Sequence, residues 1–504
     1  MLVYASRWGL YASRDVMELG WRWIASQVRC RRIINRVFSM TKGIGIDFGT
    51  SNSAAAIFDG DELRLVQLES ADAIIPSATY IDRALTSKTG QMAVDQYIAD
   101  NTGRTVELVP EVIGETSQFV EGGGQDGAPG EVETATEKVY GAAVTDSSLQ
   151  GRLFRGTKRL LGDEDVRRLM VFDHPFRLVA LITPLLLRIR QSIEAEVGTV
   201  ASANLGYPVN FEGRDAFSNQ LALSRLGEAF GYAGVKKQHF YPEPIAAAVS
   251  FLHSNADAQG ETLLCLDFGG GTLDFCVLRR DGQNFSVVAT HGIGLGGDHL
   301  DQILFRELLF PELGKGEMWR RRGFDREIET RFPFEDFEDL LVNWAVTYTL
   351  NQNRFTTPVM ERIAAGGPAT HKFERLRDVI KHNLSYLIFA RIKTLKADLS
   401  SQQSAYLDVP EIDLRVDLSR KHFEDLIAEP LARVAQALDE TVAKAGMVHS
   451  DIDIVLGTGG SSLIPAVKQL LEDRFPQRVV EHDPFTSVAA GLAIANFRGL
   501  TFQP

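Results

Sequence analysis

Two segments of the chain share one pattern of apolar and polar positions. In each, an apolar run ends in an aspartate, a short glycine-containing turn follows, and a second apolar run comes next; the segments are residues 43–58 and 263–278. Such a pattern predicts two β-strands joined by a tight turn. Because the pattern occurs twice, we infer two related lobes that each bring one strand-turn-strand unit to a shared cleft.

The turn of the second segment has the composition of a phosphate-binding loop. It contains Gly269, Gly270 and Gly271. No Cβ shields their backbone N–H groups, so an anionic oxygen can approach several of them at once. Asp267 ends the preceding strand, from which its carboxylate can reach a hydrated divalent cation. The alternative is an ordinary hairpin with a glycine-rich turn.

The first segment repeats this plan with Asp47 and Gly49, followed by the hydroxyl groups of Thr50 and Ser51. The repetition favours phosphate binding over an ordinary hairpin. Neither segment is a Walker loop, because each lacks a Gly-Lys-Ser/Thr run and a strand, not a helix, follows the turn.

Apolar periodicity elsewhere predicts further strands and helices. A helix is expected to begin at Leu185, with Thr183 and Pro184 as its cap and first turn. Residues 316–400 are expected to be mostly helical. Further strands are predicted at 63–68, 75–81, 285–290, 405–409 and 412–418. A strand followed by a turn is expected over 203–210, and a buried strand ending in glycines over 453–461. Further helices are predicted at 185–197, 221–231, 300–309, 420–445, 465–474 and 486–497.

Two charged residues outside the hairpins are candidates for chemistry. Glu243 stands between two prolines and opens an alanine-rich helix, in which small side chains allow close packing. A glutamate there can also simply compensate the helix dipole. Lys158, beside Arg159, can be a solvated base.

Glycines recur at two further places. Gly292, Gly294 and Gly297 match the dinucleotide-binding pattern between a strand and a helix. No ribose-binding acid is evident after a following strand, so the doubled hairpins explain phosphate binding better. Gly459 and Gly460 end a buried strand, where a small backbone suits close approach by a nucleoside or phosphate.

Two stretches differ from the rest. Residues 1–40 form a basic, tryptophan-containing lead that could be a targeting or membrane-surface helix, although a secretory cleavage site is lacking. Because Met40 immediately precedes the first predicted strand, we favour a start assigned too far upstream and expect the lead not to belong to the fold. Residues 101–150 are acidic, glycine-bearing and low in periodicity, which is typical of a flexible surface insertion.

Bulk composition narrows the class of protein. The 504 residues are 44% hydrophobic and 24% charged, with a net charge of -13. Nucleic acid is therefore not expected as a partner, because phosphate backbones attract basic surfaces. No apolar run is long enough to span a membrane. Three cysteines, with Cys265 and Cys276 in the apolar strands of the second hairpin, suggest neither disulfides nor zinc and favour a reducing, cytoplasmic location.

In their order along the chain, these motifs resemble the ATPase domain of the heat-shock protein 70 (DnaK-like) chaperones, most of all the short YegD-like branch. The resemblance covers nearly everything from Gly43 to Gly491. The matching pieces are residues 45–51, 157–162, 243–248, 267–274, 295–298 and 459–461.

The resemblance implies an α/β architecture, namely the duplicated actin-like (ribonuclease H-like) ATPase fold with two lobes around a nucleotide cleft. Lobe I is expected at 41–258 and lobe II at 259–504. It further implies an ATP-binding, slowly hydrolysing chaperone ATPase with ATP/ADP and Mg²⁺ as cofactors and nucleotide-driven lobe closure. A protein client or co-chaperone would be the partner.

Roles for single residues follow from the resemblance. Asp47 and Asp267 would hold Mg²⁺ through water, Lys158 would place and polarise the attacking water, and Glu243 would complete that network. These roles suit phosphoryl transfer, which needs positioning and charge neutralisation. The implied nucleotide contacts are Gly49, Thr50, Ser51, Gly269, Gly270, Gly271, Thr272, Gly296, Gly297, Lys396, Gly459, Gly460 and Ser461, with Thr272 also counted as catalytic.

The chain departs from the family pattern at the nucleobase. Ala397 and Leu463 stand where the family has two adenine-stacking arginines, and Lys393 replaces a glutamate that binds adenosine. We therefore expect weak adenine recognition. After the last predicted helix, no acidic-leucine linker and no β-sandwich follow, so no peptide clamp of the usual kind is expected.

Two alternative functions are known among proteins of the same actin-like superfamily. One is an actin-like filament-forming ATPase, which has the same aspartate and glycine signals. The other is a sugar kinase or polyphosphate phosphatase, against which the paired contexts of Lys158 and Glu243 argue.

Overall fold

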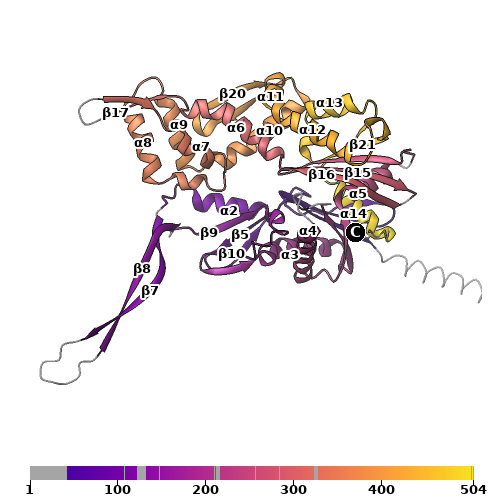
Figure 1. Ribbon diagram of the computed structural model, residues 1–504, viewed down its shortest axis with the longest axis horizontal. Coiled ribbons are helices and arrows are strands. Elements are labelled where there is room, and N and C mark those ends of the chain that lie inside the picture. Colours follow the sequence, from indigo (N-terminus) through magenta and orange to yellow (C-terminus); the bar gives the residue numbers. More distant parts are fainter. Residues whose placement is uncertain are drawn as a thin grey trace, which may run out of the picture.

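Two sheets of the same topology organise the chain (Figure 1). Their strand orders are β3-β2-β1-β12-β13 and β16-β15-β14-β21-β22. In each order the first three strands are antiparallel neighbours. The last two strands are parallel and extend the sheet on the free side of β1 in one sheet and of β14 in the other. The bounds are β1 (Gly43–Phe48), β2 (Asn52–Phe58), β3 (Leu63–Leu65), β12 (Ser202–Tyr207), β13 (Lys237–Pro242), β14 (Thr262–Phe268), β15 (Leu273–Asp281), β16 (Asn284–Ile293), β21 (Ile454–Thr458) and β22 (Val479–Glu481).

This repeated topology confirms the duplicated fold predicted from the two hairpins, which are β1-β2 and β14-β15. The computed structural model describes residues 42–106, 108–121, 132–146, 148–208, 211, 216–255, 257–282, 284–322, 327–500 and 502. The predicted basic lead lies outside the described residues.

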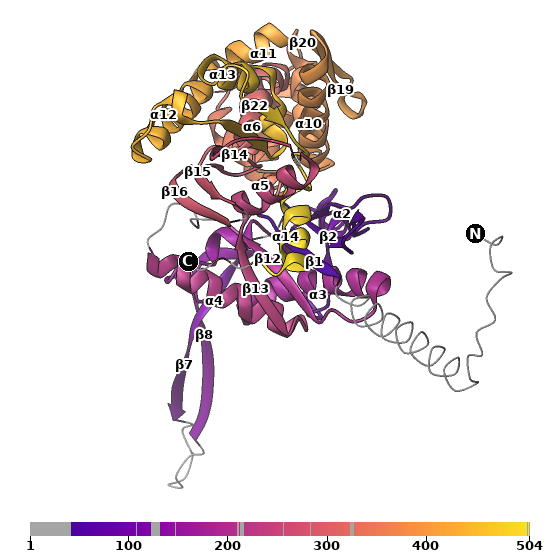
Figure 2. The same cartoon turned by 90° about the vertical axis from the view of Figure 1, so that its right-hand side faces the viewer.

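Helices α5 (Glu243–Ser254) and α14 (Ser487–Arg498) lie between the two sheets (Figure 2). Their contact is close because the facing residues are small: a Cβ on Gly491 would lie 1.7 Å from the carbonyl oxygen of Ala246. A Cβ on Gly45 of β1 would likewise lie 2.3 Å from the carbonyl oxygen of Ala489. The small side chains of α5 were predicted to allow close packing, and they bring both lobes onto one shared core.

Other helices cover the outer faces of the sheets. The first sheet packs against α3 (Leu178–Val197) and α4 (Ala216–Tyr232), whose apolar side chains share one buried cluster with β1 and β2. A larger cluster joins the second sheet to its surrounding helices. These are α6 (Gly297–Leu309), α7 (Glu335–Leu341), α8 (Asn353–Ala364), α9 (Thr370–Lys381), α10 (Ser385–Ser401), α11 (Arg420–Leu426), α12 (Ala428–Lys444) and α13 (Pro465–Arg474).

Small elements complete the two lobes. The first lobe carries a three-stranded sheet, β6-β5-β9, beside α2. Strand β4 pairs with β2, and β10 with β11; in the second lobe β17 pairs with β18 and β19 with β20. In the first lobe the bounds of these small elements are β4 (Ile75–Pro76), β5 (Ala78–Asp82), β6 (Ser87–Thr89), α2 (Gln91–Asn101), β9 (Gly151–Arg155), β10 (Arg168–Val171) and β11 (His174–Arg177). In the second lobe they are β17 (Met318–Arg322), β18 (Glu327–Arg331), β19 (Ser404–Val409) and β20 (Leu414–Ser419).

The structure corrects two predicted helices. Helix α3 begins at Leu178, before the predicted start, so Pro184 lies inside it. Burial of Leu181 and Ile182 against the first sheet outweighs the hydrogen bond that a proline cannot make. The helix predicted over 420–445 is divided at Ile427 into α11 and α12, and Pro430 lies in the first turn of the second helix, where its missing N–H costs nothing.

Two stretches that were predicted to be helical or without regular structure contain strand pairs. Within the mostly helical residues 316–400, β17 and β18 form a hairpin. In the stretch predicted as a flexible insertion, β7 (Leu108–Glu121) and β8 (Val132–Asp146) pair as a long hairpin that projects from the body (Figure 1). Apolar and polar residues alternate weakly along this stretch, so the pattern that reveals other strands is weak here.

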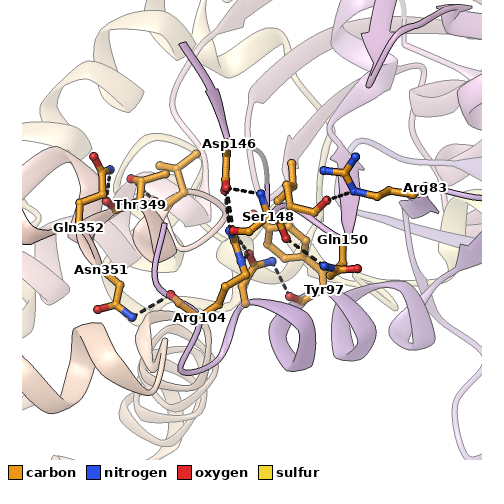
Figure 3. A network of polar contacts seen from close by, with 12 residues as sticks. Arg83, Tyr97, Arg104, Asp146, Ser148, Gln150, Thr349, Asn351 and Gln352 are labelled. Atoms are coloured by element: carbon orange, nitrogen blue, oxygen red, sulfur yellow. Dashed lines mark hydrogen bonds and ion pairs between the residues drawn. The ribbon is translucent and has the colours of Figure 1, made fainter. Parts of the chain in front are cut away.

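The two lobes touch again near the root of this hairpin (Figure 3). The side-chain amide of Asn351 donates to the carbonyl oxygen of Arg104 at 2.8 Å, and the backbone N–H of Val106 donates to the carbonyl oxygen of Asn351 at 3.1 Å. The hydroxyl of Tyr97 donates to the carbonyl oxygen of Ala345. We call these residues, with Tyr348 beneath the Arg104 guanidinium at 4.9 Å, the interlobe latch.

The guanidinium of Arg104 also fixes the root of the hairpin. It donates to both carboxylate oxygens of Asp146, at 2.9 and 2.7 Å, and to Ser148 at 2.7 Å. Both members of this ion pair are about nine-tenths buried, with side-chain exposures of 11% and 10%. Arg104 therefore holds both the end of strand β8 and the interlobe latch.

Candidate functional site

A cleft with about 1040 Å³ of empty space lies where the turns of the two hairpins meet. The turns are in contact, since the hydroxyl oxygen of Ser51 would lie 2.7 Å from a Cβ on Gly270. Most of the predicted site residues line this cleft: Asp47, Gly49, Thr50, Ser51, Lys158, Glu243, Asp267, Gly269, Gly270, Gly271, Thr272, Gly459 and Gly460.

The first turn is held in place by a residue that the sequence analysis missed. Ser77, between β4 and β5, donates its hydroxyl to the carbonyl oxygen of Gly49 at 2.7 Å. Its backbone N–H donates to the carbonyl oxygen of Ser51 at 2.9 Å. These two bonds occupy the carbonyl groups of the turn, so its N–H groups and hydroxyls stay available to an anion.

The second turn is held by the loop between β16 and α6. The N–H of Gly297 donates to the carbonyl oxygen of Gly269 at 2.9 Å, and that of Asp298 to the carbonyl oxygen of Gly270 at 2.7 Å. A Cβ on Gly296 would lie 2.2 Å from the Gly270 oxygen. The structure therefore gives Gly296 and Gly297 a packing role against the turn, although Gly297 belongs to the dinucleotide-binding pattern. Neither is among the residues lining the cleft.

Asp47 and Asp267 are each the last residue but one of the first strand of their hairpin, next to the turn. Burial and the nearby charge of Glu243 raise the pKa of Asp47 to about 7, and the same causes raise the pKa of Asp267 to about 6. Thr458 donates to Asp267 at 3.1 Å and partly offsets this rise. Buried carboxyl groups this close together are costly to ionise without a cation.

Lys158 and Glu243 form an ion pair inside the cleft, with 2.7 Å between Nζ and Oε1. Gly156, at φ 64°, turns the chain just before the lysine, and Glu243 is the first residue of α5. Burial alone would lower the pKa of Lys158, but the charges of Glu243 and Asp47 raise it above the usual value. The lysine is therefore a fixed cation rather than the solvated base that was the alternative.

Asp274 is a further acid of the cleft that was not predicted as a site residue. It lies directly across the hairpin from Asp267 and accepts a hydrogen bond from the hydroxyl of Thr272 at 3.1 Å. Burial, followed by the charge of Asp267, raises its pKa to about 7. The cross-strand position was the available signal, because directly paired residues on one face of a hairpin lie side by side.

The acids suit a cation that keeps its water ligands. Among the residues that the structure describes, no group of three or more acid, histidine or cysteine side chains is placed to hold a metal ion directly. Mg²⁺ usually retains several waters and takes only one or two carboxylates. Asp47 and Asp267 fit this role, because a cation between them would favour the ionised forms that burial disfavours.

Two further predicted contacts, Lys396 and Ser461, also lie beyond the cleft lining. Lys396 pairs with Asp301, with 2.5 Å between Nζ and Oδ1, and donates to the carbonyl oxygen of Gly297 at 3.0 Å. Ser461 is buried, and its hydroxyl would lie 2.5 Å from a Cβ on Gly297. In this conformation both support the loop that holds the second turn.

The positions expected to face the nucleobase also lie outside the cleft lining. Ala397 is exposed on α10, and Leu463 ends the short 3-10 turn that follows Gly459. Lys393 is paired with Asp298 at 3.5 Å. The residues that the structure does place beside Gly460 on the cleft wall are Pro484, Phe485 and Val488.

The thiols of Cys265 and Cys276 are free and buried on facing positions of β14 and β15. Within the described ranges, no helix combines the length and the apolar character that crossing a bilayer requires.

Comparison with known proteins agrees with the geometry. The sequence profile of the family described as "Hsp70 protein" matches residues 179–317 and 374–497. A relative named "Heat shock 70 kDa protein BIP3", from Oryza sativa subsp. japonica, is 27% identical over 466 residues, covering 90% of this chain and 56% of that protein. "Chaperone protein DnaK 3", from a Synechococcus species, is 24% identical over 465 residues, covering 90% of this chain and 57% of its own.

The chain thus spans little more than half the length of these relatives. The profile match covers more than half of the chain, from α3 of the first lobe to α14. The two equivalent sheets and the facing hairpins have the duplicated actin-like ATPase architecture. The chain belongs to the Hsp70 family.

Proposed function

We propose that this protein is a Mg²⁺-dependent ATPase of the chaperone type, whose lobes close around ATP. The observation that carries the proposal is the contact of two phosphate-type turns over a set of buried acids, with one buried lysine between them. The names of both relatives, a heat-shock protein and a chaperone protein, support the same function.

The turns would bind the phosphates from two sides. Gly269, Gly270 and Gly271 offer backbone N–H groups, and Thr50 and Ser51 add hydroxyl donors from the opposite lobe. Asp47 and Asp267 would hold hydrated Mg²⁺. When bound, this ion neutralises negative charge on the phosphates. ATP would therefore bridge the lobes, so its binding would favour their closure.

Lys158 would position the water that attacks the terminal phosphorus. Its ammonium carries three donors, and one of them is used by Glu243 at 2.7 Å. The others can hold the attacking water and a terminal phosphate oxygen. As the water oxygen bonds to phosphorus, the bond to the bridging oxygen breaks and ADP leaves with that oxygen. Glu243 keeps the lysine in place.

The finer assignments are also proposals. The lobe boundary near residue 258 follows the change from the first sheet to the second, although α14 returns to pack on β1. The protein partner would be a client or a co-chaperone. The free buried thiols of Cys265 and Cys276 fit a reducing, cytoplasmic location.

Two substitutions separate binding from hydrolysis. Asp267→Ala should weaken Mg-ATP binding about 10- to 150-fold in isothermal titration, because a charged contact is lost. Lys158→Ala should leave binding within a few fold but slow phosphate release at least about 100-fold. Lys468→Ala, which removes a surface pair with Glu481, is the control.

The proposal fails if the wild-type protein binds no Mg-ATP, or if Lys158→Ala hydrolyses it at the wild-type rate. ATP-dependent light scattering would instead support filament formation. Phosphate transfer to a sugar would support the kinase alternative.

A further inference from the structure

Phe485 is an exposed aromatic residue on the wall of the cleft. Its side chain is 52% exposed, whereas Phe211, the other aromatic residue of the lining, is 2% exposed. Large apolar side chains left in water inside a concave surface usually mark a ligand contact. Pro484 and Val488 adjoin it and make this part of the wall apolar.

The ring lies close to the phosphate end of the cleft. A Cβ on Gly459 would lie 2.9 Å from the carboxylate of Asp267, and a Cβ on Gly460 would lie 2.8 Å from the Phe485 ring. Two consecutive glycines therefore separate the metal-binding acid from the aromatic ring. Their backbone spans roughly 4 to 8 Å, which leaves room for the sugar of a nucleotide whose phosphates lie on the turns.

The loop that carries Phe485 is held rigidly. Its N–H donates to the carboxylate of Asp483 at 2.9 Å, and the N–H of Thr486 donates to the same oxygen at 3.0 Å. The carbonyl oxygen of Pro484 accepts from the N–H of Gly459 at 2.7 Å. The backbone beneath the ring is thus fixed to α14 and to the glycine strand end, so little order has to be gained when a ligand stacks on it.

We propose that Phe485 is the residue on which the nucleobase stacks. The inference rests on the proposed function and adds to it the identity of the base contact. Neither Ala397 nor Leu463 lines the cleft, while Phe485 does. A phenyl ring stacks on any base, because every base has a π-face. The protein therefore accepts purine triphosphates with little discrimination between ATP and GTP.

The test compares nucleotides with a ligand that has no base. Isothermal titration of the full chain with Mg-ATP, Mg-GTP and Mg-tripolyphosphate gives three affinities for each variant. Phe485→Ala should lower both nucleotide affinities roughly 5- to 150-fold and leave tripolyphosphate affinity unchanged. Phe485→Leu, a second variant that keeps apolar volume, should lie between Phe485→Ala and wild type. Tyr406→Ala, at a side chain 50% exposed elsewhere, is the matched control.

A spectroscopic readout is independent of affinity. In Phe485→Trp, saturating Mg-ATP should quench the new indole fluorescence, measured against wild type, whereas Mg-tripolyphosphate should not. An equal loss of affinity for all three ligands in Phe485→Ala would indicate a structural role and overturn the inference. Unchanged nucleotide affinity in this variant would overturn it as well. Failure of wild type to bind either Mg-ATP or Mg-tripolyphosphate would instead overturn the proposed function.

Discussion

Gly296→Ala adds one methyl group at the point where the turn between β14 and β15 is supported. The new Cβ would lie 2.2 Å from the carbonyl oxygen of Gly270 and 2.5 Å from the carbonyl carbon of Gly271. The backbone at Gly296 is extended, with φ −135° and ψ −179°, so alanine adopts it without strain. The perturbation is therefore purely steric, and it acts on backbone atoms that cannot rotate away.

The size of the effect follows from these distances. Non-bonded atoms in contact lie about 3.5 Å apart, so the turn and the supporting loop must separate by roughly 1 Å. Overpacking of this kind costs about 1 to 3 kcal/mol. If the displaced turn loses that much of its contact with phosphate, Mg-ATP affinity falls roughly 5- to 150-fold.

The neighbouring Gly294 supplies the control. A Cβ on Gly294 meets nothing within 4 Å. In isothermal titration, Gly296→Ala should lose the same factor in affinity for Mg-ATP and for Mg-tripolyphosphate. Gly294→Ala should keep the wild-type affinity for both ligands. Thermal unfolding without ligand would verify that both variants fold.

The reasoning would be refuted if Gly296→Ala bound Mg-ATP as tightly as wild type, or if Gly294→Ala were equally impaired. The first result would mean that the turn does not hold the phosphates. The second would mean that flexibility of the glycine loop, and not contact with Gly270, governs binding.

Two further predictions concern the interlobe latch and the loop of Phe485. Asn351→Ala removes the hydrogen bond to the carbonyl oxygen of Arg104. Release of a fluorescent ATP analogue, measured by stopped flow, should therefore accelerate roughly 2- to 12-fold. Gln436→Ala, on the exposed face of α12, is the control, and an unchanged release rate in Asn351→Ala would show that the latch does not limit cleft opening. Burial would raise the pKa of Asp483, but hydrogen bonds from Thr486 and Phe485 hold it below the usual value. Its contribution to stability is therefore complete above the unfolded pKa near 4 and is lost as pH falls through the folded pKa. Asp483→Asn should lower the urea midpoint at pH 7, and its difference from wild type should shrink as the pH falls below about 4. A difference that stays constant as the pH is lowered would argue against the charge.

Much of the site could be predicted because its chemistry is encoded locally. Asp47 and Asp267 lie at the end of an apolar run, and glycines follow within two residues, so sequence neighbours supply both the acid and the glycine turn that we propose to bind Mg²⁺ and phosphate. Duplication then predicted the two lobes. The structure repeats one strand order around both hairpins, as that inference requires.

Residues that act across strands or between loops were missed for a physical reason. Asp274 joins the acids only through its pairing with Asp267, and Thr458 reaches the same carboxylate from a parallel strand far along the chain. Ser77 holds the first turn from another connection. Register and loop docking decide these contacts, and neither is visible in local periodicity.

Tertiary packing also overrode local signals at element ends. Pro184 resembles a helix start, yet α3 continues through it because the preceding turn is buried on the first sheet. The glycine pattern that includes Gly297 resembles a dinucleotide-binding loop, yet Gly296 and Gly297 pack against the second turn in the fold.

The sequence by itself determined the two aspartate-glycine turns, the alanine-rich helix opened by Glu243, and the family to which the chain belongs, since each depends on residues close together in the chain. Only the tertiary structure decided which side chains complete the cleft. Lys158 is a buried cation because α5 places the Glu243 carboxylate 2.7 Å from its ammonium group. Phe485 is exposed on the cleft wall because Asp483 and Gly459 hold its loop at the cleft. Such roles depend on burial and on distances between segments remote in the sequence, which arise only when the chain folds.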